Sequence, residues 1–218
     1  MVEFNKKDVG KPKNFIKTGN APKAFEKLGG KGGELIKTKT KQNLSPEERT
    51  KLNSKLVKAV ELGKIGKIKV LLEEGADVNV RDVTSWTPLH IAINQSGIAV
   101  NYIRNLELIK LLIAKGANIN VTDYEGMTPL HFTAYAGDIK IAKLLIKEGA
   151  DVNATGHHRW TPLHLAAIHD CPKYISFLLG KGARMDVRDS DGKTPWGKAD
   201  EFNNTKCTKL LQRLFFYA

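Results

Sequence analysis

Four apolar runs with the spacing of a buried helix face recur along the chain, and each ends in Gly-Ala. They read IKVLLEEGA (68–76), LIKLLIAKGA (108–117), IAKLLIKEGA (141–150) and ISFLLGKGA (175–183). Apolar residues three and four positions apart predict an amphipathic α-helix with one buried side. The glycine suits a left-handed residue that ends a helix, and the alanine leaves room for close stacking. The pattern therefore predicts four similar helices that end in the same way.

Two further motifs repeat in step with these runs. TPLH occurs at 87–90, 128–131 and 161–164 and TPWG at 194–197, at steps of 41, 33 and 33 residues. GADVN (75–79), GANIN (116–120), GADVN (149–153) and GARMD (182–186) follow the same steps. Proline suits the first turn of a helix, where its missing N–H is not needed, and the threonine before it can act as the N-cap. One unit therefore reads turn, short helix, second helix, turn.

Two motifs in fixed phase at a 33-residue period resemble the ankyrin repeat family over residues 45–218. The resemblance implies an all-α solenoid of about five units, each an antiparallel helix pair with a projecting β-hairpin loop. Such units bury their apolar faces only against their neighbours. We expect the units to span 45–80 (N-terminal cap), 81–121, 122–154, 155–187 and 188–218 (C-terminal cap).

Three departures from the pattern carry expectations of their own. The first unit lacks TPLH and opens with SPEER, in which Ser45 can cap a helix, Pro46 begins it and Glu48 completes a capping box. Eight extra residues near 97–105 should lengthen one or both helices of the second unit; they are a recognition feature or a neutral insertion. The chain ends Leu-Phe-Phe-Tyr-Ala (214–218), which either folds back on the last helix or offers a patch to a partner.

The net charge of +12 is concentrated at the start of the chain. Residues 1–44 hold eleven lysines against four carboxylates, while residues 45–218 hold 24 basic and 19 acidic residues. This first stretch is rich in glycine and has apolar residues only in pairs, so we expect a flexible tail without a core. Its many lysines without arginine would suit diffuse attraction to nucleic acid or an anionic membrane, and a solvated leader is the simpler interpretation.

Neither catalytic nor cofactor chemistry is indicated. Cys171 and Cys207 lack a CxxC partner, and no nucleophile elbow, HExxH or Walker loop occurs. Zinc at His157, His158, His169 and Cys171 is a minor alternative, because adjacent histidines in an extended loop point to opposite sides. No apolar stretch is long enough for a membrane span or signal peptide, which favours a cytoplasmic protein.

The remaining candidates are surface residues for a partner. The resemblance implies that His90, His131 and His164 of TPLH are structural, and that loop tips and first helices contact partners. Trp86, Met127 and Trp160 precede Thr-Pro and would line one edge as anchors or pack against the neighbouring turn. The other candidates are Arg81, Tyr124, His157, His158, Arg159 and Arg188 at the tips, and Gln95, Tyr135 and His169 on the helix side.

We therefore expect a non-enzymatic, monomeric module that binds another protein. One alternative is binding of nucleic acid or an anionic membrane by the basic tail, with the array as an adaptor. Another follows from the lysine-, isoleucine- and asparagine-rich composition, which resembles that of AT-rich genomes: a protein secreted by an intracellular bacterium into a host cell and directed at a host protein.

Overall fold

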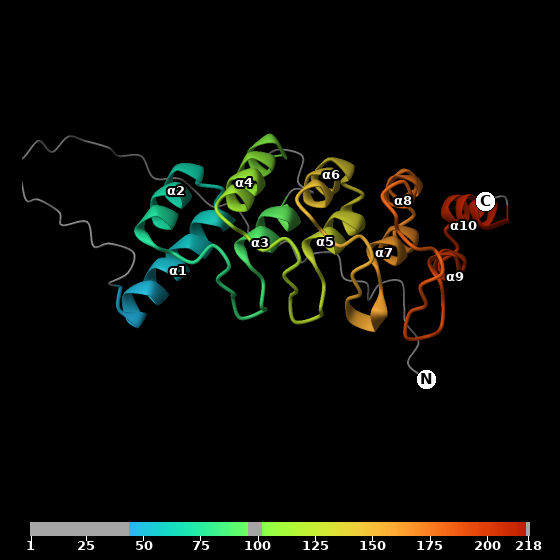
Figure 1. Cartoon of the computed structure of the whole chain (residues 1–218), viewed down its shortest axis with the longest axis horizontal. Coiled ribbons are helices and arrows are strands. Elements are labelled where there is room, and N and C mark those ends of the chain that lie inside the picture. Colours follow the sequence, from blue (N-terminus) through green and yellow to red (C-terminus); the bar gives the residue numbers. More distant parts are fainter. Residues whose placement is uncertain (1–43, 96–101, 217–218) are drawn as a thin grey trace, which may run out of the picture.

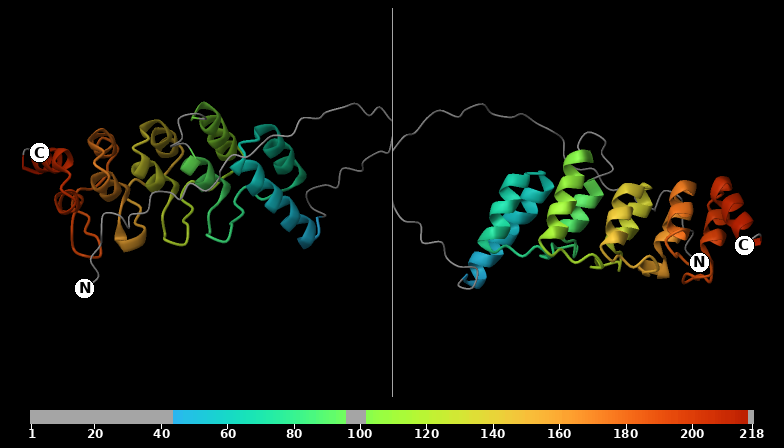
Figure 2. Two further views of the ribbon diagram at one scale, coloured as in Figure 1. Left: turned by 180° about the vertical axis from the view of Figure 1, so that it is seen from behind. Right: turned by 45° about the horizontal axis from the view of Figure 1, so that its top comes forward.

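The computed structural model describes residues 44–95 and 102–216, which form a single row of helix pairs stacked in chain order (Figure 1). The pairs are α1 (Pro46–Glu61) with α2 (Ile65–Glu74), α3 (Pro88–Asn94) with α4 (Tyr102–Ala114), α5 (Pro129–Ala136) with α6 (Ile139–Lys147), α7 (Pro162–Ile168) with α8 (Pro172–Leu179), and α9 (Pro195–Glu201) with α10 (Thr205–Phe216). The first helices form one layer and the second helices another, and the loops between pairs project from the side of the first helices (Figures 1 and 2). This confirms the predicted all-α repeat solenoid.

The projecting loops contain less β structure than the predicted hairpins. No strand occurs in the described ranges, and one loop carries a 3-10 turn, η4 (His157–Arg159). Each loop is instead closed at its base by a backbone hydrogen bond, such as that from Asp123 N to Met127 O at 3.1 Å, and has a further backbone bond within the turn, such as that from Gly126 N to Asp123 O at 3.1 Å. The loops are therefore tight turns on a helical framework.

The helix boundaries fall where the turn chemistry of the sequence puts them. The Ser45 hydroxyl accepts the Glu48 N–H at 3.2 Å, and the Glu48 carboxylate accepts the Ser45 N–H at 3.0 Å, so the predicted capping box is confirmed. The glycines of the Gly-Ala pairs are left-handed, as predicted, with φ of 106° at Gly75 and 94° at Gly149. Prolines begin α1, α3, α5, α7, α8 and α9.

One continuous apolar core runs through the stack and is shared between units. The leucine of TPLH shows this most clearly, because Leu89, Leu130 and Leu163 are each fully buried. They lie on the short first helices α3, α5 and α7, which contact one another in succession. Each unit is therefore completed by the next one along the chain.

The eight-residue insertion is only partly a helix extension. α4 has 13 residues, whereas α6 in the following unit has nine, and α3 is no longer than α7. The insertion thus adds one helical turn to the second helix and none to the first. Residues 96–101, the tail at 1–43 and the terminal pair 217–218 lie outside the described residues, as do the side chains of Phe215 and Phe216.

A ladder of asparagine side chains links successive Gly-Ala turns. Asn120 donates from Nδ2 to Gly149 O at 2.9 Å and accepts the Asp151 N–H on Oδ1 at 2.9 Å. Asn79 bridges to the next turn in the same way, as does Asn153, which bonds Gly182 O and Arg184 N. The final asparagine of GADVN therefore holds the first residues of the following unit's turn.

A second ladder is made by the histidines of TPLH. In unit 3 the Thr128 N–H donates to Nδ1 of His131 at 3.0 Å, while Nε2 lies 3.0 Å from Trp160 O in the next unit. A backbone N–H can only donate and a carbonyl can only accept, so Nδ1 is unprotonated and Nε2 carries the proton. His90 bonds to Met127 O and His164 to Lys193 O in the same arrangement. The predicted structural role of these histidines is confirmed.

We expect stability to fall on mild acidification because of this ladder. Burial lowers the pKa of His131 from 6.5 to about 4 and also lowers the pKa of His90 and His164. Between these pH values the unfolded chain binds more protons than the folded one, so the stabilisation is complete above pH 6.5 and is lost as the pH falls towards 4. His131 alone accounts for about 3 kcal/mol. Urea unfolding at pH 7.0, 5.5 and 4.5 measures this; a free energy of unfolding that stays constant or rises on acidification would contradict it.

Breaking one rung of the asparagine ladder should weaken one unit junction. We expect Asn153→Ala to lower the free energy of unfolding by about 1 to 2 kcal/mol, because two backbone groups lose their partner. Asp186→Ala is the matched control, since Asp186 occupies the same repeat position but pairs only with exposed Arg184 of its own turn. Equal losses for both variants in urea denaturation would show that the rung contributes nothing specific.

Candidate functional site

An aspartate near the start of three of the loops organises the whole loop. Oδ1 of Asp123 accepts the N–H groups of Glu125 and Met127, both at 2.9 Å. Asp82 and Asp189 make equivalent pairs of bonds in their own loops. One carboxylate oxygen thus fixes the turn without help from any strand, as in other Asx turns.

The other carboxylate oxygen of two of these aspartates reaches the preceding unit. The indole N–H of Trp86 donates to Asp123 Oδ2 at 3.2 Å, and that of Trp160 donates to Asp189 Oδ2 at 3.2 Å. The tryptophan before Thr-Pro in one unit therefore locks the loop of the next. Adjacent loops are held in a fixed relation by these bonds.

The junction between units 3 and 4 is built differently. The Met127 side chain has no N–H to donate, and the following loop has Gly156 in place of the aspartate. A Cβ at Gly156 would lie 2.6 Å from Met127 Sδ and 3.2 Å from Gly126 O, so a larger residue here would require the Met127 side chain and the neighbouring loop to shift. Packing replaces the hydrogen bond between the units, while the loop itself closes as the others do, through Gly156 N to Trp160 O at 2.9 Å.

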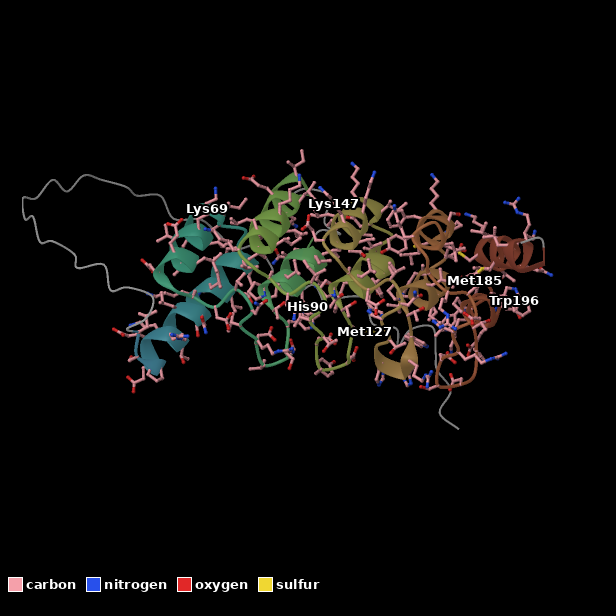
Figure 3. The ribbon with its side chains drawn as sticks, viewed as in Figure 1. Lys69, His90, Met127, Lys147, Met185 and Trp196 are labelled. Carbon is pink, nitrogen blue, oxygen red and sulfur yellow. The ribbon has the colours of Figure 1, made fainter. Side chains whose placement is uncertain are left out.

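The structure places the three predicted anchors largely in the interior. Trp160 is 7% exposed and Met127 9% exposed, and Trp86 is half-buried with its ring edge-on to Phe132 at 5.2 Å. Figure 3 shows Met127 at the base of the loops, below the helices and close to His90. Packing against the neighbouring turn, the second of the two interpretations, describes Met127 and Trp160. Their burial leaves them little surface for a partner.

The tip residues predicted to read a partner lie outside. Tyr124 is 69% exposed, with its hydroxyl donating to Glu125 at 3.0 Å, and the rings of His157 and His158 lie 3.9 Å apart. His158 and Arg159 are left-handed, with φ of 54° and 60°, which is uncommon for residues with a side chain. The Ser190 N–H of the next loop donates to His158 O at 2.8 Å and supports this turn.

Two tip arginines have part of their guanidinium committed to the framework. Nη1 of Arg81 donates to Thr122 O of the next unit at 2.6 Å. Nη1 of Arg188 donates to Gly192 O within its own loop at 2.7 Å. Both side chains remain exposed. They can contact a partner with their remaining N–H groups.

On the helix side, the predicted residues pair with each other or with the backbone. The rings of Tyr135 and His169 lie 4.1 Å apart, and burial lowers the pKa of His169 to about 4. Gln95 donates from Nε2 to Glu61 O at 3.0 Å, which ties α3 to the first unit. Tyr135 and His169 come from successive units and form one half-buried ring pair, whereas Gln95 lies apart from them.

The described residues offer little reactive chemistry. They contain no group of three or more His, Cys, Asp or Glu side chains placed to hold a metal ion. Burial raises the pKa of the Cys171 thiol and raises that of Cys207 to about 12, so neither thiol is activated as a nucleophile. Within the same ranges, no helix has the length and apolar character needed to cross a membrane.

A pocket that was not predicted from the sequence lies at the C-terminal end of the stack. It has a volume of about 320 Å³, and its lining comprises Met185, Asp186, Arg188, Thr194, Trp196, Leu211 and Gln212. Trp196 holds the position of the buried TPLH leucines but is 43% exposed, because no described unit follows it (Figure 3). The change from TPLH to TPWG was the available signal.

Comparison with known protein families agrees with this geometry. Residues 96–189 match the family model described as ankyrin repeats (3 copies), and this part of the chain belongs to the ankyrin repeat family. Members of this family are generally protein–protein interaction modules and are typically not enzymes. The comparison with curated proteins gives no match.

We expect Trp160 to act on stability rather than on surface chemistry. Trp160→Ala should lower the free energy of unfolding by about 3 kcal/mol or more, because it opens a cavity and leaves Asp189 without its indole partner. Tyr124→Ala, at an exposed tip, should leave the urea midpoint nearly unchanged. The reverse order of the two midpoints would show that Trp160 is not part of the framework.

Proposed function

We propose that this protein is a non-enzymatic module that binds another protein with its loop tips and the adjoining side of its first helices. The observation that carries the proposal is the rigid attachment of exposed side chains. Tyr124, His157 and Arg159 are exposed on adjacent loops, and those loops are tied to their neighbours by the backbone bonds and packing described above. A surface that is already ordered loses little conformational entropy when a partner binds.

The chemistry of the tips supports recognition of a folded or extended polypeptide. Tyrosine and arginine are enriched among residues that dominate protein interfaces, because each combines a large contact area with directional hydrogen bonds. The left-handed backbone at His158 and Arg159 adds a second argument. Backbone strain of this kind is found where surrounding structure holds a side chain in place for binding.

The proposal extends to the absence of catalysis. The two thiols have raised pKa values, and the TPLH histidines use both ring nitrogens within the framework. Each TPLH histidine is therefore unable to act as a general base without breaking a junction between units. Recognition is the activity that remains for the loop side of the array.

Affinity capture with a matched pair of triple variants tests this function. Tyr124→Ala/His157→Ala/Arg159→Ala should lose a protein captured by the wild type, since it removes tip contacts from adjacent loops. The control, Lys67→Ala/Glu107→Ala/Lys173→Ala, changes three exposed residues of the second helices and shifts the net charge equally. It should keep the same captured protein.

The captured proteins are compared by mass spectrometry after both variants have been shown to unfold at the wild-type urea concentration. Capture of the same proteins by the tip variant would refute binding at the tips. Loss of those proteins by the control alone would place the binding surface on the opposite side of the array.

A further inference from the structure

Charge is distributed unequally between the two helix layers. The first helices α3, α5 and α7 contain no Asp, Glu, Lys or Arg at all. The last three second helices carry only positive charge: Lys140, Lys143 and Lys147 on α6, Lys173 on α8, and Lys206, Lys209 and Arg213 on α10. All seven side chains are exposed. We call this set the outer basic face.

The outer basic face lies on the side of the array away from the loop tips. Figure 3 shows Lys147 and Lys69 over the second helices, whereas His90 and Met127 lie towards the loops. Among the described residues, Lys143, Lys147 and Lys209 take part in no ion pair. Their charge is therefore directed to solvent and is not balanced by the protein's own carboxylates.

The charges form a field rather than a single line. Lys140, Lys143 and Lys147 are three and four residues apart, so they share one side of α6 and span about 10 Å along it. α8 and α10 continue the field across the array, since the second helices lie side by side (Figure 2). Glu148 follows α6 and Lys181 follows α8, so these two turns add one charge of each sign.

We propose that the outer basic face binds the phosphate backbone of double-stranded nucleic acid. Lysines clustered on one face are the electrostatic footprint of such binding, and their neutralisation of phosphates releases condensed counterions. Lysine acts as a point charge without the planar fork of arginine, so the contact is independent of base sequence.

The scarcity of exposed apolar side chains on these helices favours a nucleic-acid duplex over a lipid bilayer or a single strand as the ligand. Among the described side chains, the exposed large apolar ones are Leu62, Val70, Val83, Ile103, Tyr124 and Trp196, none of them on α6, on α8 or on α10 up to Leu214. A basic surface that docks stably on a membrane normally adds an apolar group that inserts. Stacking of unpaired bases needs exposed aromatic rings, and Tyr174 and Phe177 of α8 are buried and half-buried.

Fluorescence anisotropy with a labelled 20-base-pair DNA duplex of arbitrary sequence tests the proposal on the full chain. The test variant is Lys143→Gln/Lys147→Gln/Lys209→Gln. The control, Lys51→Gln/Lys55→Gln/Lys58→Gln, removes three exposed lysines of α1 and the same net charge. Lys58 and Lys147 each lie in the last turn of a helix, so the two triples are matched in their effect on helix ends as well.

The outer-face triple should weaken binding about tenfold or more at 100 mM NaCl. It should also reduce the slope of log Kd against log salt by about 2 to 3, since each lost phosphate contact contributes about 0.9. The control should keep the wild-type slope, and both triples should keep the wild-type urea midpoint. Equal weakening in both triples, or in neither, overturns the proposal.

Vesicles and protein capture separate this face from other surfaces. Vesicles of phosphatidylcholine and phosphatidylserine (4:1) should bind the outer-face triple and the control alike; if vesicle binding falls in the outer-face triple while duplex binding does not, the ligand is a membrane and the proposal is wrong. The tip variant should bind the duplex as the wild type does. The two proposals can therefore fail independently.

Discussion

Hydrogen bonds from one unit to the backbone of the next are the constraint on which this structure depends. Each full unit has short helices that could not persist alone, and its loop and Gly-Ala turn contain backbone groups that need partners. Asn120 and His131 supply those partners across the junction, together with the shared core around Leu130. Each unit is therefore ordered by its contacts with its neighbours, and the same contacts hold the exposed loops in place.

The fold could be predicted from the sequence because successive units repeat the same signals for the start and end of a helix. Thr-Pro begins a helix, a left-handed glycine ends one, and the spacing of these signals defines the unit before any contact is known. The role of Trp160 was harder to predict. A large residue before Thr-Pro suits a surface anchor as well as a junction, and only the partner carboxylate on Asp189 decides between them.

The sequence nevertheless contains a signal for the pairing of Trp160 with Asp189. Tryptophan before Thr-Pro is followed by aspartate in the next loop, as with Trp86 and Asp123, whereas Met127 is followed by Gly156. The pocket beside Trp196 and the outer basic face could not be found in this way. Both arise from the arrangement of residues that are distant in sequence, and the only signal in the periodic pattern is the change from TPLH to TPWG at the pocket.

The Met127–Gly156 junction also restricts how such an array can evolve. If unit 3 were deleted by recombination, Trp86 would face Gly156, and its indole N–H would find no carboxylate. If unit 3 were duplicated in tandem, Met127 of the first copy would meet Asp123 of the second, at a position where a Cβ would lie 2.6 Å from the Met127 sulfur unless that side chain moved. The repeats share the same motifs. They differ in the residue before Thr-Pro and in the loop residue that it faces in the next unit. Gain or loss of a single repeat would therefore mismatch these two positions at the new junction.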